Sequence, residues 1–313
     1  MTRKDIIYYV LISLMWATTL NALKLGMNHG FSIFLFAGLR FFLGGIFLIP
    51  FIFFMKKNNG VPFLKKFRLE KGDGIKVVVL SFLMFSVPYS FLYVGLAYLP
   101  SGIAGIIGSS IPLFTMLFAH FFLHDEKFNW IKILGIFLGM GGLALLAVSA
   151  NRSFSSDDWG KFITGFIFYT ICAVSFGAAN VAAKKMKIQS DSKVSTFYQT
   201  VIGGAAIIFL SFFLDKKSVE YPDFTAVLSL LYVAIFGTAV SFVMYYPMIN
   251  RLGATKMSTI PLNIPLIAVT VGYFLLGETI SPVAILSALL IISGVVLLLF
   301  YHPKKEKKLL SQR

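Results

Sequence analysis

Two histidines and two acids stand close together in the stretch MLFAHFFLHDEKFNW, residues 116–130. His120 and His124 are four residues apart, so a helix would place both imidazoles on one face. Asp125 and Glu126 follow directly. Imidazole and carboxylate groups at this spacing can bind a metal ion or form a hydrolytic centre. Whether they do so depends on the elements that carry them.

The composition places those elements in a membrane. The chain has 313 residues, of which 58% are hydrophobic and 13% charged, whereas soluble domains average about 25% charged residues. Apolar stretches of about 20 residues recur along the chain, which is the length that crosses about 30 Å of hydrocarbon. The single cysteine, Cys172, excludes an internal disulfide and most thiolate metal sites. The first apolar stretch follows Arg3 and Lys4 and lacks a small-residue cleavage site, so we expect it to remain as a span.

The chain is therefore predicted to be an all-α polytopic membrane protein with ten transmembrane helices. Turn and capping residues such as Asn28-His29-Gly30 and Ser281-Pro282 separate the apolar stretches. The predicted helices are 5–27, 31–55, 74–98, 102–123, 130–149, 161–182, 193–214, 224–249, 255–276 and 282–301.

Positive charge predicts the orientation of these helices. With the N-terminus in the cytoplasm, 22 of the 28 Lys and Arg residues fall in inside segments and four in outside segments. The other two, Lys24 and Arg40, lie within spans. Such a bias is the positive-inside signal, so we expect a multi-pass cell-membrane protein with both termini cytoplasmic. The net charge of +15 then follows from topology and does not indicate nucleic-acid binding, and the basic tail 302–313 would lie against anionic lipid.

An internal repeat divides the chain into two halves. At a shift of 152 residues, 116–130 aligns with AVTVGYFLLGETISP at 268–282, so that Glu126 meets Glu278. At a shift of 160, SLMWATTLNALK (13–24) aligns with AVSFGAANVAAK (173–184). We predict two five-helix repeats, 5–149 and 161–301, in which Glu126 and Glu278 mark equivalent positions. Because five is odd, equivalent helices cross in opposite directions, which is the architecture of many secondary transporters.

These residues resemble an EamA-type transporter of the drug/metabolite transporter superfamily. The resemblance covers nearly the whole chain. Its marks are Trp16 and Lys24, Arg40 in FAGLRF, LAYLPSGIAGIIGSSIPLF (96–114), FGTAVSF (236–242), NRLGATKMS (250–258), Pro265 and LLGE (275–278). The resemblance implies ten helices and transport of small metabolites or drugs, often export. The chain departs from the usual pattern at Ile33, at Phe176 and at the His124-Asp125-Glu126 copy of LGE.

Polar side chains inside spans are the candidates for substrate binding, because they are costly in hydrocarbon. Arg40 lies about ten residues into its helix, roughly 15 Å deep, where it could pair with a carboxylate or phosphate or bond backbone carbonyls. Lys24 and its counterpart Lys184 could instead reach an interface. The candidate substrate-binding residues are Arg40, Trp16, Asn21, Lys24, Tyr89, Tyr93, Asn180, Tyr198, Gln199 and Asn263.

Prolines and glycines are expected to shape the helices around these groups. Pro88, Pro112 and Pro265 each remove a backbone donor and are candidate helix bends or gating positions. Gly135 and Gly139 form a GxxxG spacing that permits close helix packing, either inside the chain or between subunits. A homodimer and a monomer fit the sequence equally well.

The predicted function is secondary transport of an amino acid or another anionic or zwitterionic metabolite, by alternating access and in the export direction. No Asp or Glu occupies the middle of a span, so we do not expect a proton-coupling carboxylate at depth. Multidrug efflux and metabolite uptake remain alternatives, and a membrane-embedded enzyme or a channel is more remote. The expected partners are a small-molecule substrate and the lipid bilayer, with no cofactor.

The internal repeat argues against a metal-binding or catalytic role for His120 and His124. In the repeated copy Gly272 aligns with His120 and Leu276 aligns with His124, whereas the glutamate recurs. An acid just before a helix N-terminus is favourable because of the helix dipole. We therefore predict an architectural role for Glu126 and Glu278, with no metal site and no catalytic residues.

Overall fold

The apolar stretches form helices in the computed structural model, which describes residues 3–54, 62–122, 130–151, 156–215, 221–252 and 281–300, with single residues among 260–277. All regular secondary structure in this part of the chain is helical. Seven of its helical segments are long and apolar enough to cross a membrane. The predicted helix at 255–276, except for those single residues, and the tail 302–313 lie outside the described residues.

The described residues of the first half form ten helical elements. They are α1 (Arg3–Asn28), α2 (Ile33–Ile46), α3 (Ile49–Phe53), the 3-10 helix η2 (Phe63–Phe67), α4 (Asp73–Ser81), the π-helical turn η3 (Phe82–Ser86), α5 (Val87–Tyr98), α6 (Ser101–Gly108), α7 (Ile111–Phe122) and α8 (Trp130–Asn151).

The described residues of the second half also form a series of helices. Its elements are α9 (Ser156–Met186), α10 (Ser192–Leu214), α11 (Phe224–Ala234), the π-helical turn η4 (Ile235–Val240), α12 (Ser241–Leu252) and α15 (Pro282–Phe300). Ser281 begins α15 as predicted, because its Oγ accepts a hydrogen bond from Ala284 N at 3.2 Å.

Two helices that were predicted as continuous are broken in the structure. The stretch 31–55 forms α2 and α3, and the stretch 102–123 forms α6 and α7. Pro50 and Pro112 lie in the first turn after the respective breaks. A proline has no N–H and its ring clashes with the carbonyl four residues earlier, so it is tolerated at the start of a helix but not in its interior.

Two further helices, predicted as 74–98 and 224–249, contain the π-helical turns η3 and η4. Hydroxyl groups bond carbonyls beside both turns. Thr238 Oγ1 donates to Val233 O at 3.1 Å, and Ser86 Oγ donates to Gly203 O of α10 at 3.2 Å. π-Helical turns are rare in proteins, and many of those known lie at functional sites. Hydropathy patterns do not reveal them, because the residue that each turn adds is itself apolar or small.

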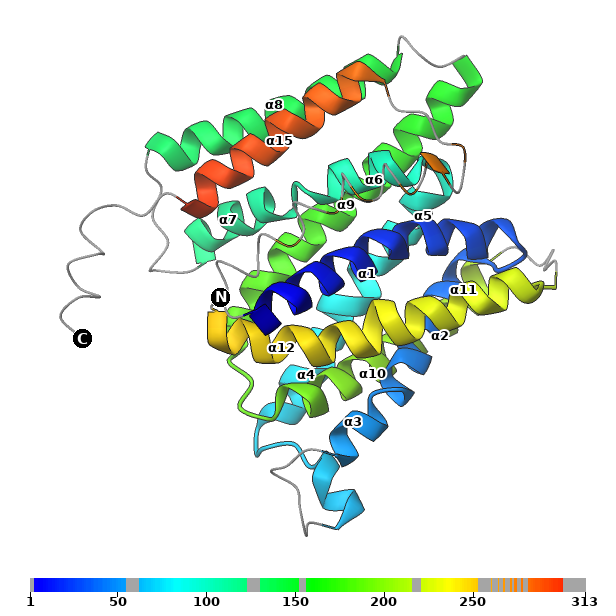
Figure 1. Cartoon of the computed structure of the whole chain (residues 1–313), viewed down its shortest axis with the longest axis vertical. Coiled ribbons are helices and arrows are strands. Elements are labelled where there is room, and N and C mark those ends of the chain that lie inside the picture. The colour runs from blue at the N-terminus through cyan, green and yellow to red at the C-terminus, as the bar shows by residue number, and fades with distance from the viewer. Residues whose placement is uncertain are drawn as a thin grey trace.

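The helices pack in pairs that join the two halves of the chain. α2 lies against α10, α5 against α9, and α1 against α11, while α8 and α15 run side by side along one edge of the bundle (Figure 1). The main core lies between these pairs, where Phe36, Tyr93, Leu96 and Cys172 are fully buried. Each half therefore buries its apolar surface chiefly against the other.

Glycines allow the closest of these contacts. A Cβ at Gly204 of α10 would lie 2.8 Å from Gly38 O and 2.5 Å from Phe42 N, both backbone atoms of α2. On α8, Gly135 and Gly139 meet Gly294 of α15, so the GxxxG spacing serves packing inside the chain. Small residues let helix backbones approach where no hydrophobic effect drives association, as in lipid.

Substitution of Gly204 by leucine should destabilise the protein, because its side chain would collide with backbone atoms that cannot rotate away. We expect a loss of about 1–3 kcal/mol, typical of overpacking. The control is Gly141→Leu on α8, where nothing lies within 4 Å of the added Cβ. Thermal unfolding in detergent measures both variants, and an equal decrease in melting temperature would contradict the proposed α2–α10 contact.

Candidate functional site

A cavity of about 740 Å³ lies between the helices of both halves. This volume falls within the range of about 300–1,000 Å³ that is usual for small-molecule sites. Both halves contribute to its walls. The lining residues include Trp16, Thr19, Leu23, Arg40, Phe85, Tyr89, Gly105, Phe176, Asn180, Lys184, Lys187, Ile188, Ser190, Gln199, Phe242 and Tyr245.

Arg40 of α2 is the charged group in the interior of this cavity. Its side chain is only 4% exposed. Nε donates to Thr238 Oγ1 at 3.3 Å and Nη2 to Gly237 O at 3.5 Å, both in the π-helical turn η4. The residues that the structure describes provide no ion pair for Arg40. Because a buried charge with only neutral partners is incompletely compensated, this guanidinium would favour an anionic group in the cavity.

Aromatic rings surround the guanidinium. Its central carbon lies 4.8 Å from the ring centre of Phe41 and 5.3 Å from that of Tyr89. Tyr89 also packs against Phe176 of α9, with ring centres 5.1 Å apart. These contacts provide cation–π stabilisation and keep the planar fork in one orientation.

A second group of rings lines the part of the cavity formed by α1 and α12. Trp16 lies 5.3 Å from Tyr245 and 6.3 Å from Phe242 between ring centres. Phe242 in turn lies 6.1 Å from Phe85 of η3. The sequence did not single out Phe85 or Phe242, because phenylalanine facing a cavity and phenylalanine facing lipid have the same hydropathy. Phe85 lies in the π-helical turn η3 and Phe242 lies two residues after η4, and the sequence pattern reveals neither turn.

Five of the ten predicted substrate-binding residues meet at this cavity. Trp16, Arg40, Tyr89, Asn180 and Gln199 all line it. Asn180 Nδ2 also donates to Thr115 Oγ1 at 3.2 Å.

Four others do not line the cavity. Asn21 Oδ1 accepts from Ser101 Oγ at 2.7 Å, and Lys24 Nζ donates to Leu99 O at 2.9 Å. Tyr93 is fully buried in a T-shaped contact with Phe36, and its hydroxyl interacts with Arg40 behind the cavity wall. Tyr198 donates to Phe67 O at 3.0 Å. The remaining predicted residue, Asn263, lies outside the described residues, as do Pro265, Glu126 and Glu278. Pro88 and Pro112 begin α5 and α7.

The histidine pair is only partly described. His120 on α7 packs near the ring of Phe121, whereas His124 and Asp125 lie outside the described residues. No group of three His, Cys, Asp or Glu side chains that could hold a metal ion occurs among the residues whose positions the structure gives.

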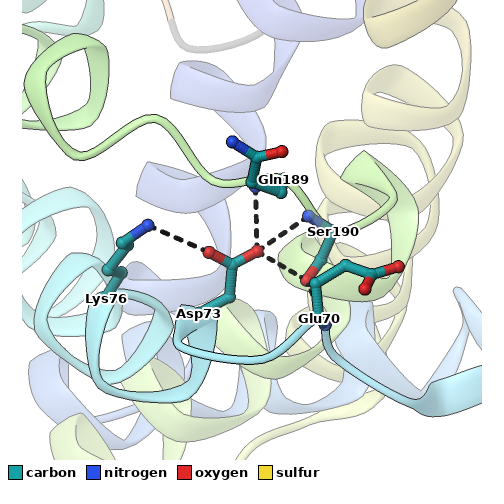
Figure 2. A network of polar contacts seen from close by, with 5 residues as sticks. All are labelled: Glu70, Asp73, Lys76, Gln189 and Ser190. Atoms are coloured by element: carbon teal, nitrogen blue, oxygen red, sulfur yellow. Dashed lines mark hydrogen bonds and ion pairs between the residues drawn. The ribbon is translucent and has the colours of Figure 1, made fainter.

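One end of the bundle is tied together by Asp73, and we call it the Asp73 end (Figure 2). Asp73 Oδ2 accepts hydrogen bonds at 2.8 Å from Gln189 N, Ser190 N and Ser190 Oγ, and Oδ1 accepts from Lys76 Nζ at 3.2 Å. The backbone N of Glu70 donates to Ser190 Oγ at 2.8 Å. Asp73 thus connects the start of α4 in the first half with the α9–α10 connection in the second half.

The opposite end, reached along the length of α10, is tied by two other aspartates, and we call it the Asp215 end. Asp215 accepts from Ser32 Oγ at 2.7 Å and from the N–H groups of Phe34 and Leu35 at 3.1 and 3.0 Å, so it caps α2. Asp223 begins α11 and lies 2.8 Å from His29 Nδ1.

The pKa of the Asp223 carboxyl is lowered, first by the hydrogen bond from Ala226 N and then by that from His29. A lowered carboxyl pKa stabilises the fold above the usual carboxyl range, and this contribution is lost as the pH falls through the lowered value. The Asp223–His29 contact is therefore expected at neutral pH.

The cavity reaches only one of these ends. Its lining includes Lys187, Ile188 and Ser190 at the Asp73 end and extends past Arg40 to Leu23 and Gly105. None of the residues that tie the Asp215 end belongs to the described lining. The arrangement is a deep cavity with an aromatic, cationic interior and a mouth that carries lysines.

The fold and this cavity define a multi-pass membrane protein with a cavity between its two halves. The model of the EamA-like transporter family matches residues 3–148 and 163–300. The chain therefore belongs to the EamA-like transporter family, as its resemblance predicted.

Known relatives agree with this assignment. The chain is similar to the uncharacterized transporter YoaV of Bacillus subtilis, with 28% identity over 91% of this chain and 92% of that protein. It is also similar to a probable amino-acid metabolite efflux pump of Salmonella typhimurium, with 27% identity over 94% of both chains. A solved crystal structure shares the fold with a TM-score of 0.64 and 18% identity, covering 95% of this chain and 96% of the other.

Replacement of Asp73 by alanine should lower the melting temperature by several degrees, because it leaves the two buried donors of Ser190 and the partly buried N–H of Gln189 without their acceptor. Glu70→Ala is the matched control, since Glu70 takes part through its backbone N alone. Thermal unfolding of the two purified variants gives their melting temperatures. If Glu70→Ala lowers the melting temperature as much as Asp73→Ala does, the Asp73 carboxylate does not hold this end together.

Proposed function

We propose that the protein is a secondary transporter that carries a small metabolite with an anionic group, such as an amino acid, across the bacterial plasma membrane by alternating access. The observation that carries the proposal is Arg40, which is buried in the cavity with a hydroxyl and a carbonyl as its described hydrogen-bond acceptors. A carboxylate can accept two parallel bonds from a guanidinium, so it would replace these weaker contacts with a matched pair.

The aromatic wall supports a substrate with an apolar body behind its anionic group. Trp16, Tyr89 and Phe176 present ring surface to the cavity, and Asn180 and Gln199 supply the amide groups. A largely apolar cavity with a small number of convergent polar groups is typical of sites that orient a small amphipathic ligand. A polyhydroxylated sugar would leave many of its hydroxyls unpaired there.

Two inverted five-helix repeats, 5–149 and 161–301, are the proposed scaffold for alternating access. The two matches of the family model support this division. So do the π-helical turns, since η3 and η4 interrupt corresponding helices of each half. The packing of the spans is compatible with a pseudo-two-fold axis, because the third span packs on the sixth, mainly through α5, and the eighth packs on the first through α11 and α12.

The two ends also carry equivalent ties, which further supports the repeat. Asp73 begins the third span and holds Gln189 and Ser190, in the connection between the sixth and seventh spans. Asp223 begins the eighth span and holds His29, in the connection between the first and second. At the shift of 160 residues His29 aligns with Gln189, so each aspartate binds the equivalent connection of the other half.

The positive-inside rule assigns the Asp73 end to the cytoplasm, with both termini on that side. The cavity then opens to the cytoplasm, where a metabolite destined for export would enter. The similarity to an amino-acid metabolite efflux pump is in keeping with this direction and with an amino-acid substrate.

A ligand-stabilisation screen tests the substrate class. Amino acids, organic acids, sugar phosphates and common drugs are added to the purified protein, and a ligand that binds the folded state raises the apparent melting temperature. We expect carboxylate-bearing compounds to stabilise the protein. Stabilisation by uncharged or cationic drugs alone would instead favour multidrug efflux.

Arg40→Ala should weaken binding of such a carboxylate ligand by about tenfold or more, because a charge-assisted hydrogen bond contributes about 1.5–3 kcal/mol. The affinity of Arg40→Lys should lie between those of the unsubstituted protein and Arg40→Ala, because lysine keeps the charge but lacks the two parallel donors of the guanidinium. Arg68→Ala, at an exposed position outside the cavity lining, is the control. Titration of the melting temperature gives the affinities, and unchanged binding in Arg40→Ala would refute the proposal.

A further inference from the structure

Gln199 of α10 is a buried amide at the cavity wall. It lines the cavity, and the residue is only 8% exposed. Within the part of the chain that the structure describes, no protein group hydrogen-bonds the Gln199 side chain. Buried polar side chains usually have a partner, and one that lacks a partner costs free energy. An amide in this position is therefore available to a molecule that enters the cavity.

The face of α10 that carries Gln199 is polar from the mouth of the cavity inward. Ser192, Ser195 and Gln199 follow at spacings of three and four residues and all line the cavity, so they share one helix face. The Ser195 hydroxyl is satisfied within the helix, because it donates to Ser192 O at 3.1 Å. The next position on this face is Gly203, where a Cβ would lie 2.8 Å from the Phe85 Cβ. Gln199 is thus the innermost polar side chain that α10 contributes to the described lining.

Gln199 and Arg40 lie at successive levels of the cavity. A Cβ at Gly45 of α2 would lie 2.8 Å from Thr200 Oγ1, so Gly45 and Thr200 are at the same level of the bundle. Arg40 is five residues before Gly45, toward the start of α2 at the Asp215 end. At the helical rise, the backbones of Arg40 and Gln199 are therefore separated by about 8 Å along the bundle. Gln199 is the nearer of the two to the Asp73 end.

The cavity wall between these two levels is aromatic. The ring centre of Phe85 lies 6.3 Å from that of Tyr89, and Tyr89 lies against the Arg40 guanidinium. Phe85 also lies 6.1 Å from Phe242, which in turn lies 6.3 Å from Trp16. From the interior toward the mouth, the wall therefore presents a cation, then aromatic rings, then an amide.

We propose that Gln199 is a second anchor for the substrate, and that it binds an uncharged polar group at the end opposite to the carboxylate held by Arg40. An amide is the best match, because it can use both the N–H and the carbonyl of Gln199. An ammonium group would use the carbonyl alone, and Arg40 and the lysines of the lining would repel it. The substrate class is a carboxylate with an amide or similar donor–acceptor group several bonds away, joined by an apolar segment.

This inference rests on the proposed function, since Arg40 must hold the carboxylate at the other end. It adds selectivity to that function. A guanidinium binds carboxylates of many kinds, whereas a buried amide rejects a ligand that leaves it unpaired. Gln199 would then determine which carboxylates the cavity accepts.

The ligand-free protein provides the first test. Gln199→Met replaces the amide with an apolar chain of similar length. We expect the melting temperature to stay the same or to rise by a few degrees, because no described protein group loses a partner and a ligand-binding amide is held at a cost to stability. An amide that joins helices would behave in the opposite way, so a decrease in melting temperature would overturn the proposal.

Two probes of equal shape test recognition by the full chain. Glutaramate carries a carboxylate and a carboxamide, and 5-methylhexanoate has an isopropyl group in place of the carboxamide. Titration of the melting temperature gives both affinities. We expect the unsubstituted protein to bind glutaramate about tenfold more tightly, and Gln199→Met to reduce this preference to about twofold or less. A preference that survives in Gln199→Met, or binding of neither probe, would overturn the second anchor.

Gln189→Met is the matched control, because Gln189 is exposed, lies outside the described lining and bonds Asp73 through its backbone N. It should leave the preference for glutaramate unchanged. Arg40→Ala should weaken both probes equally, which separates the two proposals. If Arg40→Ala weakens both probes while Gln199→Met leaves the preference intact, the second anchor is wrong and the proposed function stands. If Gln199→Met abolishes the preference while Arg40→Ala changes neither affinity, the amide contact stands and the proposed role of Arg40 is wrong.

Discussion

The absence of water from the hydrocarbon core is the constraint on which the rest of this structure depends. Every backbone N–H and C=O there must find a partner within the protein. Regular helices meet this demand, and deviations from them require hydroxyl groups. Thr238 and Ser86 bond backbone carbonyls at the two π-helical turns. Gly237 O in η4 meets a different partner, the guanidinium of Arg40. The π-helical turn η4 thus provides a carbonyl acceptor for the buried charge of Arg40.

Glycine contacts bring the helices close enough for this arrangement. α2 meets α10 backbone to backbone at Gly38 and Gly204, and α5 meets α9 in the same way at Gly95 and Gly165. These contacts link the two halves, and so do the aspartates at the two ends. The cavity lies between elements of both halves that meet at these contacts. A site assembled between two bodies in this manner can change its access when one body rotates against the other.

The electrostatics of the cavity follow from where the bundle places its charged side chains. Carboxylates are used at the ends, where Asp73, Asp215 and Asp223 bind backbone or hydroxyl donors. Among the described residues the interior retains Arg40, and the mouth retains Lys184 and Lys187. The field inside the cavity is therefore positive, and aromatic faces moderate it by attracting the same cation. This distribution is the electrostatic basis for proposing an anionic ligand rather than a quaternary cation.

The amino-acid sequence by itself determined the class of the protein. Long apolar stretches require helices that cross a membrane, and the motif from Trp16 to Lys24 together with Arg40 indicated the family. It also placed Arg40 at depth, because position along an apolar helix sets depth directly. Sequence could not determine which way each polar side chain faces. Asn21, Lys24 and Tyr198 were candidates of the same rank as Gln199, yet they bond to Ser101, Leu99 and Phe67.

Only the tertiary structure decided those partners, because helix rotation depends on packing against segments that are distant in the chain. The π-helical turns are a second example, since they exist where Ser86 reaches Gly203 and where Arg40 reaches Gly237. The tie between Asp73 and Ser190 joins residues 117 positions apart, and no local pattern around either residue indicates the other. Hydropathy therefore indicates which segments enter the membrane, and contacts between those segments determine where the cavity lies and which side chains line it.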